Sequence, residues 1–392
     1  QPDLQLATYS LYKEKNEMDT AHDYLIKAFS NPELAGEVKA KAHGDLLKQM
    51  ETQKRDNLLA LLEPLMLQHH PNDPDILTTL GNKELLLKNK GAALDHYYKA
   101  LELNPSNEEV LQNCISLMFE MGENFEKIET YTQMATEEFP EKAEFWFFDG
   151  TCKLAQKKYK EAEFSLVEAL EKNNGTNKQL EILVGGQLGD TYHSLNKKEE
   201  SYKTYEKVLA QSPDNEHILN NYAYFLSLDK KDLDKAKTMS EKLVKKFPNN
   251  ATYLDTHAWV LFQMNDYENA RIYMKKALDS QDKASGIMYE HYGDILYKLG
   301  NANEALSYWK KAEGSAEASD ILSKKIKNQQ KTLQGKANKF DTFKKSMTQM
   351  DLSRGEKCLF RTIMCPLKDK CPKVKKPRWP TSNTKSFTKF GE

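Results

Sequence analysis

The stretch that decides the fold is residues 74–107, PDILTTLGNKELLLKNKGAALDHYYKALELNPSN. Gly81 supplies a small residue where a first helix can cross a second one. Ala93 and Tyr97 fall where the second helix packs, and Pro105 falls where that helix ends. Because small residues let two helices approach while larger ones fill the space to the next unit, this stretch predicts a helix hairpin that repeats.

Prolines recur along the chain at the same point of this pattern, before helix-like segments. The first interval is 34 residues and two others are 35, while the interval from Pro140 to Pro213 spans about two units. A period of about 34 residues with paired helices is the signature of tetratricopeptide repeats. The chain therefore resembles tetratricopeptide-repeat proteins across residues 74–313, on positions that include Trp146, Gly150, Tyr159, Ala162, Leu188, Gly189, Tyr205, Leu254, Ala258, Ala270, Gly293, Gly300, Ala305 and Trp309.

This resemblance implies an all-α fold, a right-handed superhelical solenoid of about nine helix hairpins. We expect two divergent hairpins in residues 1–73, with Pro64 kinking or interrupting its helix. Seven repeats follow in 74–313, and a polar capping helix in 314–334 seals the last apolar face. Residues 335–392 form an irregular, extended basic tail.

Charge is divided unevenly between these parts. Residues 335–392 hold 15 Lys and Arg against 5 Asp and Glu, while residues 1–334 hold 42 against 53. An acidic body thus carries a basic tail. No stretch approaches the roughly 18 consecutive apolar residues of a membrane helix.

Most signatures of catalysis are absent from the sequence. It contains no phosphate-binding G-x-x-x-x-G-K-[ST], no H-E-x-x-H and no G-x-S-x-G. Cys114 and Cys152 occupy positions that take small apolar residues, and His257 falls at an inter-helix position, so all three are interpreted as core. We expect no enzyme, no cofactor and no bound metal.

Three cysteines of the tail leave alternatives open. Cys358, Cys365 and Cys371 are spaced C-x6-C-x5-C, with no histidine in residues 335–392. A structural zinc site needs four ligands, usually with closer cysteine pairs. A zinc site, one disulfide with a free thiol, and three reduced thiols remain possible interpretations.

The resemblance also implies a working surface, the groove lined by first-helix side chains. Aromatic rings there supply area for a peptide, amides satisfy its backbone, and groove carboxylates favour a neutral or basic partner. The alternative is that the aromatics pack between repeats or lie under the chain's own tail. The groove positions of the early units include Thr78, Thr79, Asn82 and Asn113; the candidate partner-binding residues are Phe147, Phe148, Asn220, Asn221, Tyr224, Asp255, Trp259, Phe262 and Tyr297.

Residues 216–313 look most like bacterial, Bacteroidota-like cell-envelope repeat proteins. That likeness implies a non-enzymatic scaffold in an envelope assembly for outer-membrane biogenesis, secretion or motility. The expected location is the periplasm or the outer membrane, with membrane association only through partners; the alternative is the cytoplasm. The tail is expected to dock on protein, or alternatively to bind nucleic acid in a ribonucleoprotein adaptor, through Lys373, Lys375, Lys376, Arg378 and Trp379.

Overall fold

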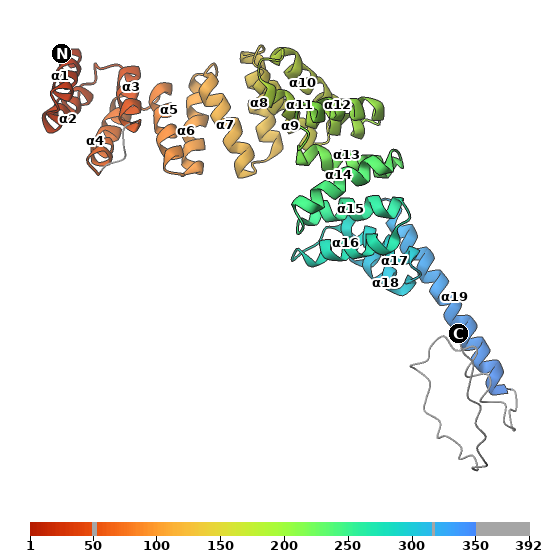
Figure 1. Ribbon diagram of the computed structural model, residues 1–392. Coiled ribbons are helices and arrows are strands. Elements are labelled where there is room, and N and C mark those ends of the chain that lie inside the picture. Colours follow the sequence, from red (N-terminus) through yellow and green to blue (C-terminus); the bar gives the residue numbers. More distant parts are fainter. Residues whose placement is uncertain (49–52, 316–317, 350–392) are drawn as a thin grey trace, which may run out of the picture.

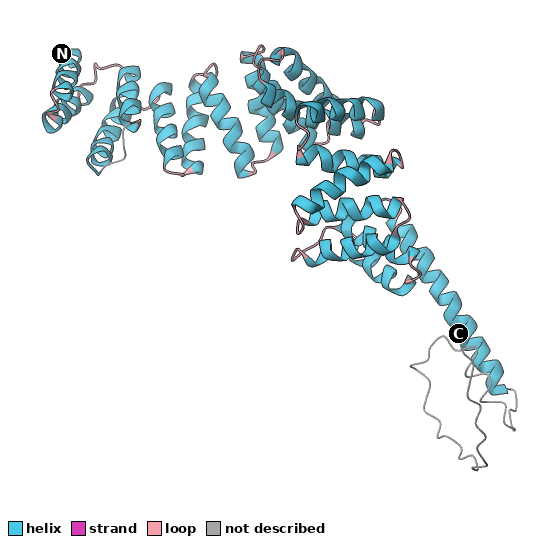
Figure 2. Cartoon of the chain, viewed as in Figure 1, coloured by secondary structure: helices cyan, strands magenta, loops and turns pink. Residues whose placement is uncertain are grey.

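The computed structural model describes residues 1–48, 53–315 and 318–349, and within them every regular element is an α-helix (Figure 2). The helices are α1 Pro2–Glu14, α2 Met18–Phe29, α3 Gly36–Leu47, α4 Gln53–His69, α5 Pro74–Leu86, α6 Lys90–Leu103, α7 Glu108–Met121, α8 Phe125–Glu138, α9 Ala143–Ala155, α10 Tyr159–Asn173, α11 Lys178–Ser194, α12 Lys198–Gln211, α13 Glu216–Asp229, α14 Leu233–Lys246, α15 Ala251–Gln263, α16 Tyr267–Asp279, α17 Gly286–Lys298, α18 Ala302–Ala312 and α19 Leu322–Gln349.

The helices pack in consecutive pairs, from α1 with α2 to α17 with α18, and neighbouring pairs stack on one another. Figure 1 shows the pairs following one another in a row that changes direction near α13, with α19 leaving the far end. The all-α solenoid of nine hairpins is therefore confirmed. We call the odd-numbered helix of each pair its first helix and the even-numbered one its second helix.

Several first helices begin at an asparagine whose side chain caps them. Asn107, Asn177, Asn215 and Asn250 each accept a hydrogen bond from the backbone N–H three residues later, at 3.1 Å in all four cases. A cap of this kind satisfies one of the N–H groups that the first turn leaves without a partner. The repeat thus carries its own start signal.

The turns inside the pairs share a residue with left-handed backbone. Positive φ angles occur after the first helix in every pair whose turn the structure describes, at Asn16, Lys88, Gly122, Lys157, Asn196, Lys230, Asn265 and Gly300. Asparagine and glycine adopt this conformation at little cost, whereas lysine is held there against a penalty of roughly 1 kcal/mol. Packing of the two helices therefore imposes the turn even where the local residue disfavours it.

Glycines at the crossings within pairs confirm the interpretation of the repeat pattern. A Cβ added to Gly81 would lie 2.6 Å from the Tyr97 ring, and one added to Gly189 would lie 2.4 Å from the Tyr205 ring. Both rings are fully buried. The first helix lacks a side chain at this point because an aromatic ring of the second helix fills that space.

Other core assignments are confirmed as well. Cys114 and Cys152 are buried free thiols, and burial raises the pKa of Cys114 to about 12 and that of Cys152 to about 11. His257 is buried, its Nδ1 lies 2.9 Å from Ser240 Oγ, and burial lowers its pKa to about 4. These thiols stay protonated and the imidazole stays neutral at pH 7, which suits packing.

The expected interruption at Pro64 and the expected bounds of the capping helix are wrong. α4 runs through Pro64 without interruption from Gln53 to His69, with Leu62 and Met66 buried on its packed face. The capping helix starts at Leu322 instead of 314 and continues to Gln349, so residues 335–349 are helical and not part of an irregular tail. Lysine and glutamine are good helix formers, and they outweigh the absence of a repeat frame there.

One buried cation in α3 gives a prediction about stability. The Lys39 side chain is fully buried, its Nζ has no hydrogen-bond partner, and burial lowers its pKa. Lys39→Met should raise the free energy of unfolding by about 1–3 kcal/mol, because the unsatisfied ammonium is removed. Urea unfolding measures the change.

The matched control for this prediction is Lys41→Met, since Lys41 lies exposed on the same helix. In the unaltered protein, stability should increase as pH rises from the lowered pKa of Lys39 toward the ordinary value of 10.5, because the unfolded chain binds the additional proton. Equal stability of Lys39→Met and Lys41→Met would contradict the assigned cost.

Candidate partner-binding surface

The side chains of successive first helices are joined by polar contacts along one face of the solenoid, which we call the first-helix face. Each contact connects residues 31 to 36 positions apart, one repeat to the next. The joined pairs are His43 with Thr79 at 3.1 Å, Thr151 with Gln187 at 2.8 Å, Asn221 with Asp190 at 2.9 Å, His291 with Asp255 at 2.8 Å, and Lys325 with Glu290 at 2.7 Å. Many groups expected to face a partner are thus already hydrogen-bonded to the neighbouring repeat.

Asp190 is the centre of the contact between α11 and α13. Its carboxylate accepts hydrogen bonds from Asn221 Nδ2 at 2.9 Å, from His217 Nε2 at 3.0 Å and from the Tyr205 hydroxyl. The bond to Asp190 raises the pKa of His217 against the effect of burial. Asn220, beside them, donates to Asn221 Oδ1 at 3.2 Å, and its own Oδ1 is buried without a partner.

Aromatic rings continue the first-helix face over α13, α15 and α17. The Trp259 ring stacks on the His291 ring with centroids 3.9 Å apart, and on the Phe262 ring at 4.6 Å. The Tyr224 ring lies 6.2 Å from His291, and burial, with the nearby Asp255, raises the pKa of Tyr224. Trp259 is only 8% exposed and its indole N–H has no partner.

The other candidate aromatics lie at two separate places. Phe147 and Phe148 on α9 are half-buried, with ring centroids 5.9 Å apart, and Phe148 stacks on Phe119 of α7 at 6.1 Å. Tyr297 is 49% exposed and its ring lies 5.5 Å from that of Trp309. The nine predicted residues therefore belong to one face but not to one pocket.

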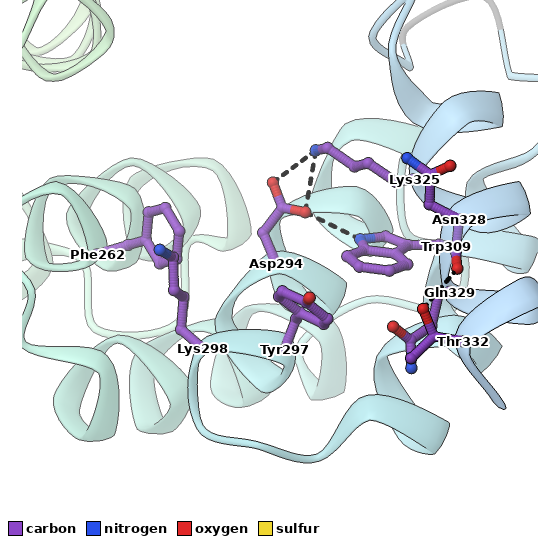
Figure 3. Close-up of a pocket in the computed structure, with 9 residues that line it drawn as sticks. All are labelled: Phe262, Asp294, Tyr297, Lys298, Trp309, Lys325, Asn328, Gln329 and Thr332. Carbon is purple, nitrogen blue, oxygen red and sulfur yellow. Dashed lines mark hydrogen bonds and ion pairs between the residues drawn. The ribbon is translucent and has the colours of Figure 1, made fainter. Parts of the chain in front are cut away.

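A C-terminal cleft of about 350 Å³ lies where α19 meets the last two pairs (Figure 3). Lys325 of α19 reaches into it, with Nζ 2.7 and 2.9 Å from the Asp294 oxygens and 2.7 Å from Glu290. Trp309 Nε1 donates to Asp294 at 2.9 Å. The cleft is lined by Phe262, Asp294, Tyr297, Lys298, Trp309, Lys325, Asn328, Gln329 and Thr332.

Lys325 lowers the pKa of both Glu290 and Asp294 relative to the effect of burial alone. Burial alone would raise the pKa of Glu290, but hydrogen bonds from Lys325 and Ser319 outweigh it and hold that pKa below the ordinary value. Burial raises the pKa of Asp294 in spite of Lys325. A lysine of the chain's own last helix thus pairs with two carboxylates of the first-helix face.

An N-terminal cleft of about 710 Å³ lies on α3, α5 and α7. It contains the groove positions Thr78, Thr79, Asn82 and Asn113, and Leu86 on its wall is 65% exposed. The residues of α3 in it had no signal in the sequence, because the repeat frame is weak there. The lining residues are Glu37, Ala40, Lys41, Gly44, Asp45, Leu47, Lys48, Asp75, Thr78, Thr79, Asn82, Leu85, Leu86, Glu109 and Asn113.

This N-terminal cleft is more acidic than basic, with four carboxylates against two lysines. Burial raises the pKa of Asp75, and the neighbouring Asp73 and Glu37 add to the rise. Among the described residues, no lysine or arginine forms an ion pair with Asp75. A positive charge brought to this point would relieve the repulsion.

Several expectations cannot be placed on this surface. The tail residues Lys373, Lys375, Lys376, Arg378 and Trp379, and the three tail cysteines, lie outside the described residues. Within the described ranges, no group of three or more His, Cys, Asp and Glu side chains is arranged to hold a metal ion. In the same ranges, no helix combines the length and apolar character needed to cross a membrane.

Comparison with known proteins supports the repeat assignment. Three models described as tetratricopeptide repeat match residues 186–215, 222–250 and 256–320. No curated protein matches the chain.

Solved structures similar to the chain share little sequence with it. The Cut9–Hcn1 hetero-tetramer of APC/C has 14% identity and a TM-score of 0.48, covering 83% of this chain and 69% of that one. Yeast Tom70 has 16% identity and a TM-score of 0.43, covering 84% and 63%. A tetratricopeptide repeat protein from Parabacteroides merdae has 17% identity and a TM-score of 0.33, covering 75% and 98%.

Proposed function

We propose that this chain, whose residues 186–215, 222–250 and 256–320 are tetratricopeptide repeats, is a non-enzymatic scaffold that binds a protein partner through its first-helix face. The observation that carries the proposal is the N-terminal cleft, a cavity of about 710 Å³ across three first helices. It combines an exposed leucine, amides and carboxylates, which are the groups that bury a partner's side chain and satisfy its backbone.

The C-terminal cleft supports the same chemistry from within the chain. There a helix is docked against first-helix carboxylates through a lysine, Lys325. In the N-terminal cleft, no lysine of the described residues forms an ion pair with Asp75 or Glu37. A partner segment with a basic side chain beside apolar ones fits this cleft by charge and by shape.

The aromatic part of the first-helix face is proposed as a second contact area. Trp259 and Asn220 each hold a buried polar atom with no partner, one a donor and one an acceptor. After a small local rearrangement, the backbone of a partner could hydrogen-bond to the Asn220 oxygen and to the Trp259 N–H. These two unsatisfied groups support a contact area around Tyr224.

Site-specific photo-crosslinking tests the proposal. A photoreactive amino acid replaces Leu86 in the N-terminal cleft, and in a separate variant it replaces Ile272, which is 57% exposed on the second helix α16. In cells of the native source, we expect a protein adduct at residue 86 that weakens at least about fivefold when Asn82 and Asn113 are changed to alanine, since the partner loses both amides. Asn82 Oδ1 also accepts a hydrogen bond from the Tyr97 hydroxyl at 2.7 Å, so thermal unfolding of this variant is measured beside the crosslink.

The Ile272 position is the control, because it lies on a second helix. Adducts at position 272 with none at 86 would place the partner on the other side of the solenoid. An adduct at 86 that is insensitive to Asn82→Ala/Asn113→Ala would show contact without use of the cleft.

The finer proposal is a subunit of a bacterial envelope assembly in the periplasm or at the outer membrane. Its support is the resemblance of residues 216–313 to envelope repeat proteins. Fractionation of the native cells, with the partner identified from the crosslink, tests this location against the cytoplasm.

The second candidate is a nucleic-acid adaptor that acts through the basic tail. Its support is the charge of residues 335–392, with 15 basic against 5 acidic residues. RNA affinity measured against salt, with and without residues 350–392, separates it from the protein scaffold, because phosphate contacts give a steep salt dependence.

A further inference from the structure

α19 is chemically unlike the solenoid that it follows. Its 28 residues hold eight lysines and a single acidic residue, Asp341, whereas residues 1–321 hold 38 basic and 53 acidic residues. The solenoid is therefore strongly acidic and the helix at its end strongly basic.

Among the described side chains of α19, those packed against the solenoid lie in its first half. Leu322, Ile326 and Gln329 are at most 5% exposed, and Leu333 is half-buried. From Gln334 to Thr342 every side chain is exposed. The capping role is thus complete at Leu333, and it leaves the rest of the helix, as far as Gln349, unexplained.

The apolar stripe of α19 nevertheless continues past that point. Ile326, Leu333 and Phe340 are spaced at heptad intervals, which places them on one face of a helix. Phe340 is 42% exposed. The apolar pattern of the sealing face therefore extends beyond the packed half of the helix.

Neither the solenoid nor a second copy suits this exposed part. Figure 1 shows α19 pointing away from the helix pairs, so its far half is not directed at the chain's own acidic surface. Pairing with the same part of the helix, residues 334–349, in another copy would bring two segments of net charge +3 together, which is unfavourable.

The arrangement of lysines favours a lipid surface over a protein groove. Lys336 lies three residues after Leu333 and four before Phe340, on the same face as the apolar residues. A protein groove would bury its ammonium, whereas at a bilayer surface the chain can extend so that the ammonium reaches the lipid phosphates. Lys331 and Lys339, both exposed, flank the stripe.

We propose that residues 333–342 of α19 bind an anionic lipid bilayer as an interfacial amphipathic helix. The apolar stripe enters the boundary of the acyl region, and the lysines contact anionic headgroups. This proposal goes beyond the scaffold function: the chain contacts the membrane itself and not only through partners.

Vesicle co-sedimentation of the full chain tests the proposal. The vesicles are phosphatidylcholine alone, or phosphatidylcholine with phosphatidylglycerol as about a third of the lipid, each at low and at high NaCl concentration. We expect binding to the anionic vesicles that weakens with salt, and at least about tenfold weaker binding to phosphatidylcholine alone. Lys336→Glu/Lys339→Glu should reduce anionic-vesicle binding by about tenfold or more, since each lysine near such a surface contributes roughly fivefold.

Matched variants separate the helix from the rest of the chain. Phe340→Glu should also reduce binding about tenfold, while Ile272→Glu, a change at an exposed apolar residue of α16, should not. Lys160→Glu/Lys203→Glu makes the same charge change on exposed lysines of α10 and α12 and should leave binding unaltered. Thermal unfolding should be the same for all variants, because the altered side chains are exposed.

Four outcomes would overturn the proposal. The first is that the chain does not bind anionic vesicles, and the second is that it binds both vesicle types equally. The third is that the α10/α12 control loses as much binding as the α19 variants, and the fourth is that the α19 variants still bind anionic vesicles. The last would assign the lipid contact to residues 350–392, which these variants leave intact. A labelled single-stranded RNA whose binding is lost with Phe340→Glu and that displaces the vesicles would assign the helix to nucleic acid instead.

Discussion

Lys325→Met should lower the free energy of unfolding by about 2–4 kcal/mol, because it leaves Glu290 and Asp294 side by side in the C-terminal cleft without their cation. Glu290 is 3% exposed, so water cannot replace the lost partner. The expected loss of free energy is smaller than that for breaking a fully buried ion pair, because the Lys325 side chain is 22% exposed and solvent weakens its interaction. Urea unfolding followed by circular dichroism measures it.

The control for this variant is Lys324→Met, the adjacent exposed lysine of α19, which should change stability by less than about 0.5 kcal/mol. Equal effects of the two variants would show that α19 is not held by the ion pairs. Hydrogen exchange should show α19 opening first in Lys325→Met, since its packed half is then held mainly by buried apolar side chains such as Leu322 and Ile326.

The pH dependence follows from Glu290. Its pKa in the folded chain is lowered, so its contribution to stability is present above the unfolded pKa and is lost as pH falls through the folded value. Glu290 should therefore contribute a loss of stability below about pH 4.5, the ordinary glutamate pKa, while Asp294, whose pKa is raised, contributes in the opposite direction. In Lys325→Met this loss should shrink, because the Lys325 bond that lowers the pKa of Glu290 is gone while only those from Ser319 remain.

Gly189→Ala should lower the free energy of unfolding by about 2–3 kcal/mol, although alanine is the better helix former. The new methyl would lie 2.4 Å from the Tyr205 ring, which is fully buried and donates a hydrogen bond to Asp190. The ring cannot retreat without disturbing that bond, so the cost is that of overpacking. Chemical unfolding gives the value.

Gly91→Ala is the control for Gly189→Ala, and we expect it to change stability in the opposite direction. A Cβ at Gly91, in α6, would meet nothing within 4 Å. This variant should gain up to about 1 kcal/mol from helix propensity alone. Stabilisation by both glycine substitutions would show that the crossing is not as close as the structure has it.

What could be predicted from the sequence concerns contacts inside a hairpin. Gly81 and Tyr97 have the same spacing along the chain as Gly189 and Tyr205, and their sizes alone indicate where the two helices cross. Cys114, Cys152 and His257 were placed in the core by the same frame, and they are buried. Such contacts are local and recur in each unit, so the period shows them directly.

What could not be predicted is which polar groups of the first-helix face remain available to a partner. Asn221 and Asp255 were placed on the correct helices, but the sequence did not show that Asp190 and His291, from the adjoining repeats, already bond to them. Nor did it show that α19 would bring Lys325 to Glu290. These contacts depend on how one repeat is rotated on the next, which the hairpin's own residues do not specify.

The sequence by itself determined the repeat, its helix pairs and their core, because a glycine and a ring at this fixed spacing meet wherever two helices form a hairpin. The tertiary structure alone decided that the cleft of α3, α5 and α7 is open while that of α17 to α19 is occupied. The physical reason is that each first-helix side chain finds its partner on the next repeat, and only the stacked solenoid sets the distance between them.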